Sequence, residues 1–375
     1  MILLLIAVVI AAAVYQALAL VAAIARLRPP APASENLPPI SILKPVKGLD
    51  PHFYDAIRSC ATQDYPDFEM LFGVADPADP AVPVIKRLKA EFPGRRIEIV
   101  HCTSQAPNAK VASLIDLARQ ARYAVLLVSD SDIRVPAGYL RRVVTPLEDP
   151  KVGVVTCLYG ARADQWPGRW EAIGISTDFA PSVLVAPLVG VREFGLGSTL
   201  VFRREQLQAI GGFEALADYV ADDYQLACRI HRLGFRVVLS DVVVETHLSG
   251  RSWKEVWRHQ LRWARTIRVS RGGFWGYLGL PVTQASLWAL VAALLGLWEA
   301  VSFLLALRLA VGIATGAGVL RSRDVLYYFW LIPLRDLWGF AVWLNGLFGD
   351  EVTWRGSRFK LSADGRISPL EPQHD

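Results

Sequence analysis

Residues 2–25 form the feature that most constrains this chain, because they contain no charged side chain. A helix of that length can span a hydrocarbon core of about 30 Å. A secretory signal peptide begins with a basic segment and has a shorter apolar region, whereas Met1 here leads straight into the apolar run. Arg26 and Arg28 follow the run, and basic side chains favour the cytoplasmic face. We therefore predict a transmembrane anchor over residues 1–27, with the next domain in the cytosol.

Residues 40–250 are expected to form one α/β domain, after a proline-rich segment at residues 28–39 that is typical of a stiff linker. Short aliphatic runs alternate with helical patterns along the first half of this domain. Such alternation favours a parallel, doubly wound sheet. The expected strands are residues 40–46, 68–74, 97–102, 123–128, 152–158 and 199–203, and the expected helices are residues 51–63, 81–92, 109–122 and 222–233.

The C-terminal part of the chain is expected to meet the membrane again. Residues 251–275 contain a basic amphipathic helix of the kind that lies on an anionic membrane surface. Residues 281–320 are expected to form a transmembrane hairpin, broken near Glu299 or Arg308. Residues 325–347 are apolar but carry Arg335 and Asp336 at their middle, where charges are costly. That segment is either a site of paired, functional charges or a re-entrant or interfacial segment, and residues 348–375 are expected to form a cytosolic tail.

Composition and motifs exclude several classes of protein. The sequence has no GxGxxG after its first strand and no GxxxxGK[ST] anywhere, which argues against a dinucleotide dehydrogenase and a P-loop NTPase. The four cysteines lack metal-like spacing, so we expect them to be reduced core residues. Much of the basic charge lies in residues 253–271, so the net charge of +5 does not require nucleic acid as a partner.

Asp130 and Asp132 directly follow the aliphatic run of the strand at residues 123–128. In open α/β sheets, ligands bind beyond the carboxyl ends of the strands. Mg²⁺ is usually held by one or two carboxylates together with substrate phosphates. The two aspartates therefore indicate a site for a metal–diphosphate, although Asp-Ser-Asp is also good turn and helix-cap chemistry.

Two other segments have both a chemical and a structural interpretation. Asp222 and Asp223 open a predicted helix, where acidic side chains favour the helix dipole, yet a carboxylate there can also act as general base on an acceptor hydroxyl. Arg262 and Trp263 lie in the basic amphipathic helix. A role at the membrane surface competes there with one in which the guanidinium pairs with a diphosphate.

Taken in order, these segments resemble the membrane-bound GT-A glycosyltransferases, and most closely the ceramide glucosyltransferase family. Within that family the chain is more similar to a bacterial branch that acts in hopanoid biosynthesis. The matching segments are SILKPVKGLDP at residues 41–51, Asp76 within GVADPADPA, Asn108-Ala109-Lys110, Asp130-Ser131-Asp132-Ile133-Arg134-Val135, Ala221-Asp222-Asp223-Tyr224, Arg262-Trp263, and WRGSRF at residues 354–359.

The resemblance implies which residues bind the sugar donor. Asp76 is expected near a uracil base, and Asp130 near the ribose and the sugar. Lys44 and Lys110 fall in matching segments and are assigned to donor binding with them. Asp132 completes a DxD motif and is expected to ligate a divalent cation, Mg²⁺ or Mn²⁺, with Asp130 as the second carboxylate of the metal site.

The resemblance also implies the catalytic base and shows two departures from the family pattern. Asp223 matches the aspartate expected to act as base, and Arg262 and Trp263 match the end of the (Q/R)xxRW motif. The first position of that motif is His259, so no role is transferred to it. Ala180 stands where animal ceramide glucosyltransferases have a histidine, which leaves the acceptor open.

The resemblance therefore implies an α/β GT-A fold, which is a Rossmann-like domain that binds nucleotide sugars, with transmembrane helices at both ends. The expected protein is an integral protein of the bacterial inner membrane with a cytosolic catalytic domain. Its expected activity is inverting transfer of N-acetylglucosamine or glucose from a UDP-sugar to a lipid hydroxyl, most closely that of a hopanoid, bacteriohopanetetrol. The alternatives are ceramide or another lipid alcohol as acceptor, polyprenyl phosphate as acceptor, and a catalytically silent protein that binds nucleotide sugar or lipid.

Overall fold

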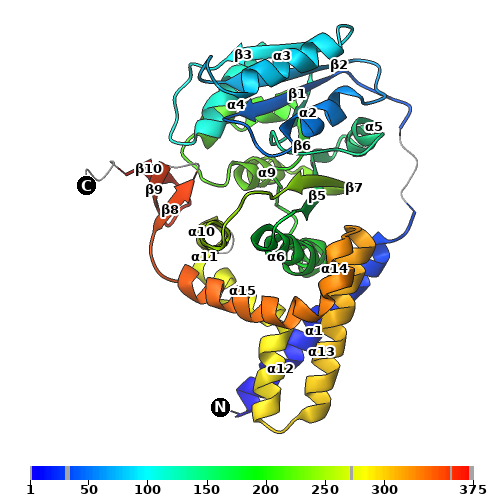
Figure 1. The fold of residues 1–375 in the computed structure, drawn as a ribbon, viewed down its shortest axis with the longest axis vertical. Helices are drawn as coiled ribbons and strands as arrows, with labels where there is room; N and C mark the ends of the chain where they lie inside the picture. The colour runs from blue at the N-terminus through cyan, green and yellow to red at the C-terminus, as the bar shows by residue number, and fades with distance from the viewer. Residues whose placement is uncertain (1, 30–33, 271–272, 355–356, 371–375) are drawn as a thin grey trace.

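The structure is a computed structural model that describes residues 2–29, 34–270, 273–354 and 357–370. An α/β domain occupies one end of the molecule, and apolar helices extend from it at the other end (Figure 1). The sheet of the α/β domain has seven strands in the order β3-β2-β1-β4-β6-β5-β7. All neighbouring strands are parallel except β6, which is antiparallel to both β4 and β5. The predicted α/β class is confirmed, but the sheet is mixed rather than purely parallel.

Helices cover both faces of this sheet, which explains why its inner strands are continuous apolar runs. One face packs against α2 (Phe53–Ala61), α3 (Ala81–Glu91) and α5 (Tyr139–Val144). The other face packs against α4 (Ala109–Gln120), α8 (Arg204–Ala209) and α9 (Asp222–Arg232). The strands are β1 (Ile40–Val46), β2 (Phe68–Val74), β3 (Arg96–His101), β4 (Val125–Val128), β5 (Val152–Arg162), β6 (Leu200–Arg203) and β7 (Arg236–His247).

Two elements of the α/β domain lie where the sequence analysis placed none. Strand β7 pairs in parallel with β5 and forms the edge of the sheet. A long helical segment follows β5 and consists of α6 (Trp166–Gly174), a π-helical turn η2 (Ile175–Phe179), α7 (Ala180–Val185) and η3 (Ala186–Val189). It is apolar enough to cross a membrane, but 67% of its most apolar stretch of 18 residues is buried inside the protein. Its apolar character is therefore largely that of a core helix.

The basic amphipathic helix is α10 (Trp253–Ser270), which packs between the α/β domain and α15 (Ile332–Gly346). Lys254 and Arg258 are exposed. Arg268 instead donates to the carbonyls of Gly346 and Leu347, at 2.8 and 2.6 Å. Cationic side chains stabilise the free carbonyls at a helix C-terminus. Part of the basic charge predicted to face a membrane surface therefore caps α15.

Among the described residues, three helices are long and apolar enough to cross a membrane, or four if one bent pair counts as a single span. Besides the buried segment above, these are α1 (Ile2–Arg26), the helix formed by α13 (Trp298–Ile313) with η6 (Ala314–Val319), and the bent pair. The bent pair joins α11 (Gly273–Leu278) and η5 (Leu280–Thr283) to α12 (Ala285–Leu294) at an angle of 70°. The predicted hairpin turns between α12 and α13, close to Glu299. It does not break at Arg308, because that residue lies within the continuous helix α13.

The segment at residues 325–347 is folded as the end of α14 (Arg323–Tyr328), η7 (Phe329–Leu331) and α15, which crosses the other apolar helices (Figure 1). Arg335 and Asp336 are both buried and both form ion pairs. The sequence predicted only a tail after residue 347, but residues 351–369 contain a small antiparallel sheet. Its strands are β8 (Glu351–Trp354), β9 (Ser357–Leu361) and β10 (Ile367–Pro369).

All four cysteines are buried and free, as predicted. They lie at Cys60, Cys102, Cys157 and Cys228.

Candidate functional site

The predicted polar residues lie together at the carboxyl edge of strands β1 and β4. They are carried by the loop after β4 and by the first turns of α4 and α9. Asp130 follows β4, and Lys110 lies in the first turn of α4. Asn108 caps α4, because its side-chain oxygen accepts hydrogen bonds from the backbone N–H groups of Lys110 and Val111 at 3.0 and 3.2 Å. The cap orients the start of α4 so that the Lys110 ammonium reaches the end of β4.

The Lys110 ammonium holds two aspartates together. Its Nζ lies 2.8 Å from Asp130 Oδ1 and 3.4 Å from Asp222 Oδ2. Burial opposes the charge on Lys110, but the carboxylates of Asp130, Asp222 and Asp223 together raise its pKa. Lys110 is therefore a permanent cation that positions the carboxylates, and the structure places it at the site predicted for donor binding.

Asp223 faces the same point from the start of α9. Its Oδ2 accepts a hydrogen bond from the backbone N–H of Gly197 at 2.8 Å. A Cβ atom at Gly197 would lie only 3.3 to 3.4 Å from Asp130 Oδ2, Lys110 Nζ and Asp223 Oδ2. Burial, followed by the neighbouring charge of Asp222, raises the pKa of Asp223 to about 6, although Lys110 acts in the opposite direction. Asp223 is therefore a carboxylate poised to exchange a proton near neutral pH.

Within the part of the chain that the structure describes, no cationic side chain forms an ion pair with Asp132, the second carboxylate of the DxD motif. Its Oδ2 accepts a hydrogen bond from Thr246 Oγ1 at 2.5 Å, which ties the motif to β7. Burial, followed by the negative charge of Asp130, raises the pKa of Asp132. Two carboxylates that repel each other in a half-buried place fit a divalent cation, because the cation would supply the missing positive charge.

The sequence analysis did not identify a second group of possible metal ligands, which includes His247 at the end of β7. The ligand atoms of His52, Asp164 and His247 are all within 4.8 Å of one another, and His247 follows Thr246. Ser249 Oγ lies 2.8 Å from His247 Nδ1 and donates to Asp164 Oδ2 at 2.7 Å. These residues are also able to ligate a metal. His247 ends β7, which was not predicted, and His52 directly precedes α2, so nothing in the sequence indicated that the two histidines meet.

Lys44 and Asp76 occupy different depths of the site. Lys44 is fully buried, and its Nζ donates to the carbonyl of Asp130 at 3.0 Å and to Ser129 Oγ at 3.2 Å. It therefore supports the chain at Asp130 from below. Asp76 is exposed beyond the end of β2, where its Oδ1 accepts a hydrogen bond from the backbone N–H of Ala78 at 2.8 Å. Asp76 is thus accessible to a ligand that reaches across the strand ends.

Arg262 approaches the site from α10. Its guanidinium carbon lies 5.9 Å from the centre of the Trp354 ring, on β8 of the small C-terminal sheet. Burial, followed by the positive charge of Arg251, lowers the pKa of Arg262 to about 10, whereas the nearby carboxylate of Asp223 raises it. Arg262 remains a cation at neutral pH, and within the described residues no carboxylate forms an ion pair with it. Arg355 and Gly356, which belong to the predicted motif after Trp354, lie outside the described residues.

Trp263 packs against the inner wall of the site, and His259 supports it. The Trp263 ring centre lies 5.9 Å from that of Phe179 and 4.7 Å from that of His259. His259 Nδ1 contacts the buried carboxylate of Glu171, to which Arg251 also donates at 2.6 Å. His259 is therefore a positioning residue between α6 and α10. The motif assigned it no role because His259 is neither the glutamine nor the arginine of the (Q/R)xxRW pattern.

Residues 4–367 match the sequence pattern of the family described as Glycosyl transferase family 21. Ceramide glucosyltransferase 1 of Caenorhabditis elegans is 29% identical over 208 residues, which are 55% of this chain and 44% of that protein. Ceramide glucosyltransferase of Pyricularia oryzae is 20% identical, and the match covers 91% of this chain and 89% of that protein. The chain thus spans less than half of the first of these relatives and most of the second.

The fold is also similar to that of a mannosyltransferase from Pyrobaculum calidifontis, solved in complex with GDP-Man and Mn²⁺. The TM-score is 0.57 at 21% sequence identity, and the match covers 92% of this chain and 99% of the other. At this identity the similarity concerns the fold. It supports the assignment of the seven-stranded domain and its apolar helices to the GT-A class.

Proposed function

The chain belongs to glycosyl transferase family 21, and from that premise we propose that it transfers a sugar from a UDP-sugar to the hydroxyl of a membrane lipid. The observation that carries the proposal is the cluster of Lys110, Asp130 and Asp223 around Gly197. That cluster combines a fixed positive charge, a carboxylate for the donor and a carboxylate free to take a proton. A silent binding protein has no need of such a base.

The base is Asp223. An alcohol has a pKa far too high to ionise unaided, so a carboxylate must accept its proton as the oxygen attacks the sugar. The raised pKa of Asp223, about 6, suits this task near neutral pH. With one base on the acceptor side, the hydroxyl displaces the nucleotide directly and the configuration at the anomeric carbon inverts. The bond to the nucleotide breaks as the new glycosidic bond forms.

Arg262 and Asp132 serve the leaving diphosphate. Negative charge develops on the β-phosphate as the sugar departs, and a guanidinium without a carboxylate partner is suited to receive it. Asp132 would hold a divalent cation together with Asp130, and the His52–Asp164–His247 group is a second candidate for a metal. When bound, such a cation stabilises the charge of the diphosphate. Asp76 contacts the uracil base, and Lys44 and Lys110 hold Asp130 in place.

A lipid acceptor is supported by the apolar helices that extend from the α/β domain. Exposed apolar side chains occur on α1, α14 and α15, and these elements pack beneath the catalytic domain. A catalytic domain held at a bilayer in this way receives a soluble donor from the cytosol and a lipid from the membrane. We propose the hydroxyl of a hopanoid as the acceptor, in a protein of the bacterial inner membrane. Ceramide is the second candidate, favoured by the ceramide glucosyltransferases that the chain matches.

Purified protein in lipid nanodiscs with Mg²⁺ tests this proposal. UDP-glucose and UDP-N-acetylglucosamine are each offered with bacteriohopanetetrol, ceramide or polyprenyl phosphate, and the lipid products are measured by mass spectrometry. We expect the hopanoid to gain the mass of one N-acetylhexosamine. A ceramide product that has gained the mass of one hexose would instead identify UDP-glucose as the donor and ceramide as the acceptor. Product from polyprenyl phosphate alone would contradict the role of Asp223, because that acceptor is already an anion.

Replacing Asp132 with alanine is expected to weaken metal-dependent donor binding by about tenfold or more. The reason is that Asp132 is the DxD carboxylate without a cationic partner. Isothermal titration of UDP with and without Mn²⁺ measures the effect, and His247→Ala is the comparison. Metal dependence that survives in Asp132→Ala but disappears in His247→Ala would place the ion at the histidine group instead.

The rate should depend on pH through Asp223. Because the pKa of this carboxyl is raised to about 6, the base is protonated and inactive below that pH and ionised above it. At subsaturating acceptor and saturating metal, kcat/KM should fall about tenfold per pH unit below pH 6 and level off above it. A flat profile between pH 5 and 8, or a rate that rises as the pH falls, would contradict this assignment.

A further inference from the structure

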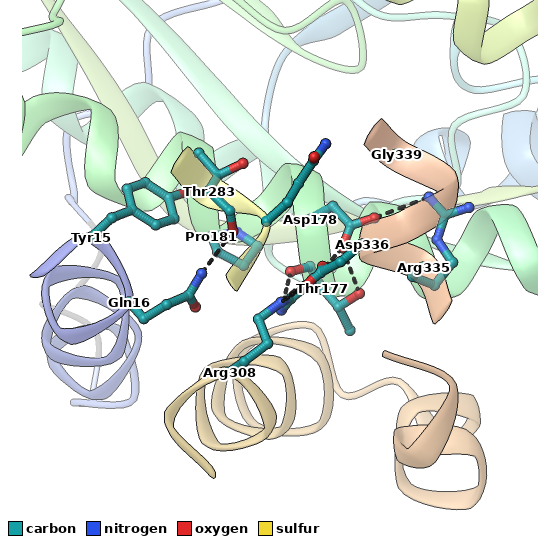
Figure 2. Close-up of a pocket in the computed structure, with 11 residues that line it drawn as sticks. Tyr15, Gln16, Thr177, Asp178, Pro181, Thr283, Arg308, Arg335, Asp336 and Gly339 are labelled. Atoms are coloured by element: carbon teal, nitrogen blue, oxygen red, sulfur yellow. Dashed lines mark hydrogen bonds and ion pairs between the residues drawn. The ribbon is translucent and has the colours of Figure 1, made fainter. Parts of the chain in front are cut away.

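A polar cavity lies where α1, α13 and α15 meet beneath the catalytic domain. Its volume is about 60 Å³, and it is partly open to the outside. That volume exceeds what one water needs and suits a small polar group rather than a whole ligand. Figure 2 shows its lining side chains, with Tyr15 and Gln16 on α1 at one end and Arg335 on α15 at the other. Two of the enclosing helices, α1 and α13, are apolar enough to cross a membrane, yet the cavity is lined by polar side chains.

Four charged residues beside the cavity neutralise one another. Arg308 donates to both carboxylate oxygens of Asp336, at 2.7 to 3.1 Å, and to Asp178 Oδ1 at 2.7 Å. Asp178 Oδ2 accepts from Arg335 Nη2 at 3.0 Å. Two guanidinium groups and two carboxylates therefore balance, and a charged ligand would disturb that balance.

Several polar atoms that line this cavity lack partners. Among the described residues, nothing hydrogen-bonds to Gln16 Oε1, Gln284 Oε1, Arg335 Nε or Arg335 Nη1, and all four atoms are buried. The two amide oxygens need donors, and the two guanidinium N–H groups need acceptors. Leaving such buried groups without partners is destabilising. A group that both donates and accepts hydrogen bonds meets both needs.

We propose that this cavity binds the uncharged, hydroxyl- or amide-bearing polar part of a membrane lipid. A hydroxyl can donate to a glutamine oxygen or accept from Arg335, an amide offers both a donor and an acceptor, and neither group adds charge to the balanced network. The apolar remainder of the lipid extends along the exposed faces of α1 and α13. The lipid is either the acceptor, held before transfer, or a bilayer lipid retained as a permanent ligand.

The position of the π-helical turn η2 links the cavity to the proposed active site. Asp178 lines the cavity, and the next residue, Phe179, contacts Trp263 beside Arg262. π-helical turns inside helices are frequent at functional sites. One turn of helix thus separates the cavity from the active site. The acceptor identity of the bound lipid rests on the proposed function, whereas the binding itself does not.

Lipid binding without donor tests the proposal. Detergent-purified protein is incubated with dioleoylglycerol, with its O-methyl ether, or with anionic dioleoylphosphatidylglycerol, and retained lipid is measured by native mass spectrometry. We expect at least fivefold greater retention of dioleoylglycerol than of its methyl ether, about the factor that one buried hydrogen bond provides. Gln16→Leu and Gln284→Leu should each reduce that preference. Gln208→Leu, on an exposed position of α8, is the matched control and should keep it.

Equal retention of the alcohol and its ether would overturn the proposal, because the cavity then holds water only. A preference for the anionic lipid would overturn it too. Addition of UDP-sugar and Mg²⁺ then identifies the source of the ligand. Consumption of the bound alcohol makes it the acceptor, and persistence makes it a resident lipid, and both support binding. If the protein retains the alcohol better than its methyl ether but forms no product from any acceptor, the proposed function is refuted and the cavity assignment stands.

Discussion

Replacing Asp223 with asparagine should lower turnover by about 10²–10⁴-fold and leave UDP-sugar affinity within about twofold, since general-base catalysis contributes a factor of this size. Asparagine keeps the shape of the side chain, and its oxygen can still accept the hydrogen bond that Gly197 N–H donates at 2.8 Å. It cannot take a proton from an alcohol. The loss should therefore appear in kcat, measured with saturating donor and acceptor, whereas donor binding is measured separately by calorimetry.

Asp222→Asn is the matched control. The same substitution can be made one residue away, at Asp222. The carboxylate of Asp222 is buried and lies 3.4 Å from both Lys110 Nζ and Asn108 Nδ2. Its loss should weaken the placement of Lys110 and reduce turnover less than tenfold. If turnover falls by the same factor in both variants, the two aspartates act as one structural unit. Turnover above a tenth of wild type in Asp223→Asn would remove Asp223 as the base.

The strands and helices up to residue 128 could be predicted because their signals are local. Each parallel strand is a short aliphatic run, and helices on both faces make its burial two-sided. Strand β7 escaped prediction because Ser240 and Asp241 interrupt its aliphatic residues, whereas the other edge strand, β3, was predicted. The direction of β6 could not be derived either, since a strand of four residues carries no sign of its orientation.

The α6–α7 segment shows a different limit of sequence reasoning. Its mean character is apolar, yet it contains Glu171 and Asp178, whose partners are Arg251 and Arg308. Those partners lie 80 and 130 residues away, so spacing alone cannot reveal them. Ion pairs between distant segments satisfy buried charges only once the fold is complete.

The motif residues of the site could be predicted from the sequence, but the contacts that each of them makes could not. The ordered motifs identified the family, which the match over residues 4–367 confirms. They did not show that Lys44 is buried beneath Asp130, or that Lys110 bridges Asp130 and Asp222. Nor did they show that Trp354 reaches Arg262 from a separate sheet. These relations depend on packing between elements, and a pattern along one chain does not contain them.

The paired charges beneath the site predict a large effect on stability. Arg335 and Asp336 were expected to be either paired or interfacial, and the structure pairs both. Asp336 also accepts a hydrogen bond from the backbone N–H of Ser286 at 2.9 Å, at the start of α12. One carboxylate thus joins α12, α13 and α15. Removing its charge leaves the buried Arg308 with Asp178 as its remaining carboxylate partner among the described residues.

Asp336→Asn should therefore lower the free energy of unfolding by about 3 kcal/mol, because breaking a buried ion pair leaves an uncompensated charge. Denaturant titration in mild detergent, followed by tryptophan fluorescence, measures this loss. Glu299→Gln, an equivalent change at the exposed tip of the hairpin, should cost at most about 0.5 kcal/mol. The double variant Arg308→Met/Asp336→Leu should be more stable than Asp336→Asn, since it removes both charges and keeps apolar volume. Equal stability of Asp336→Asn and wild type would show that Asp178 alone compensates Arg308.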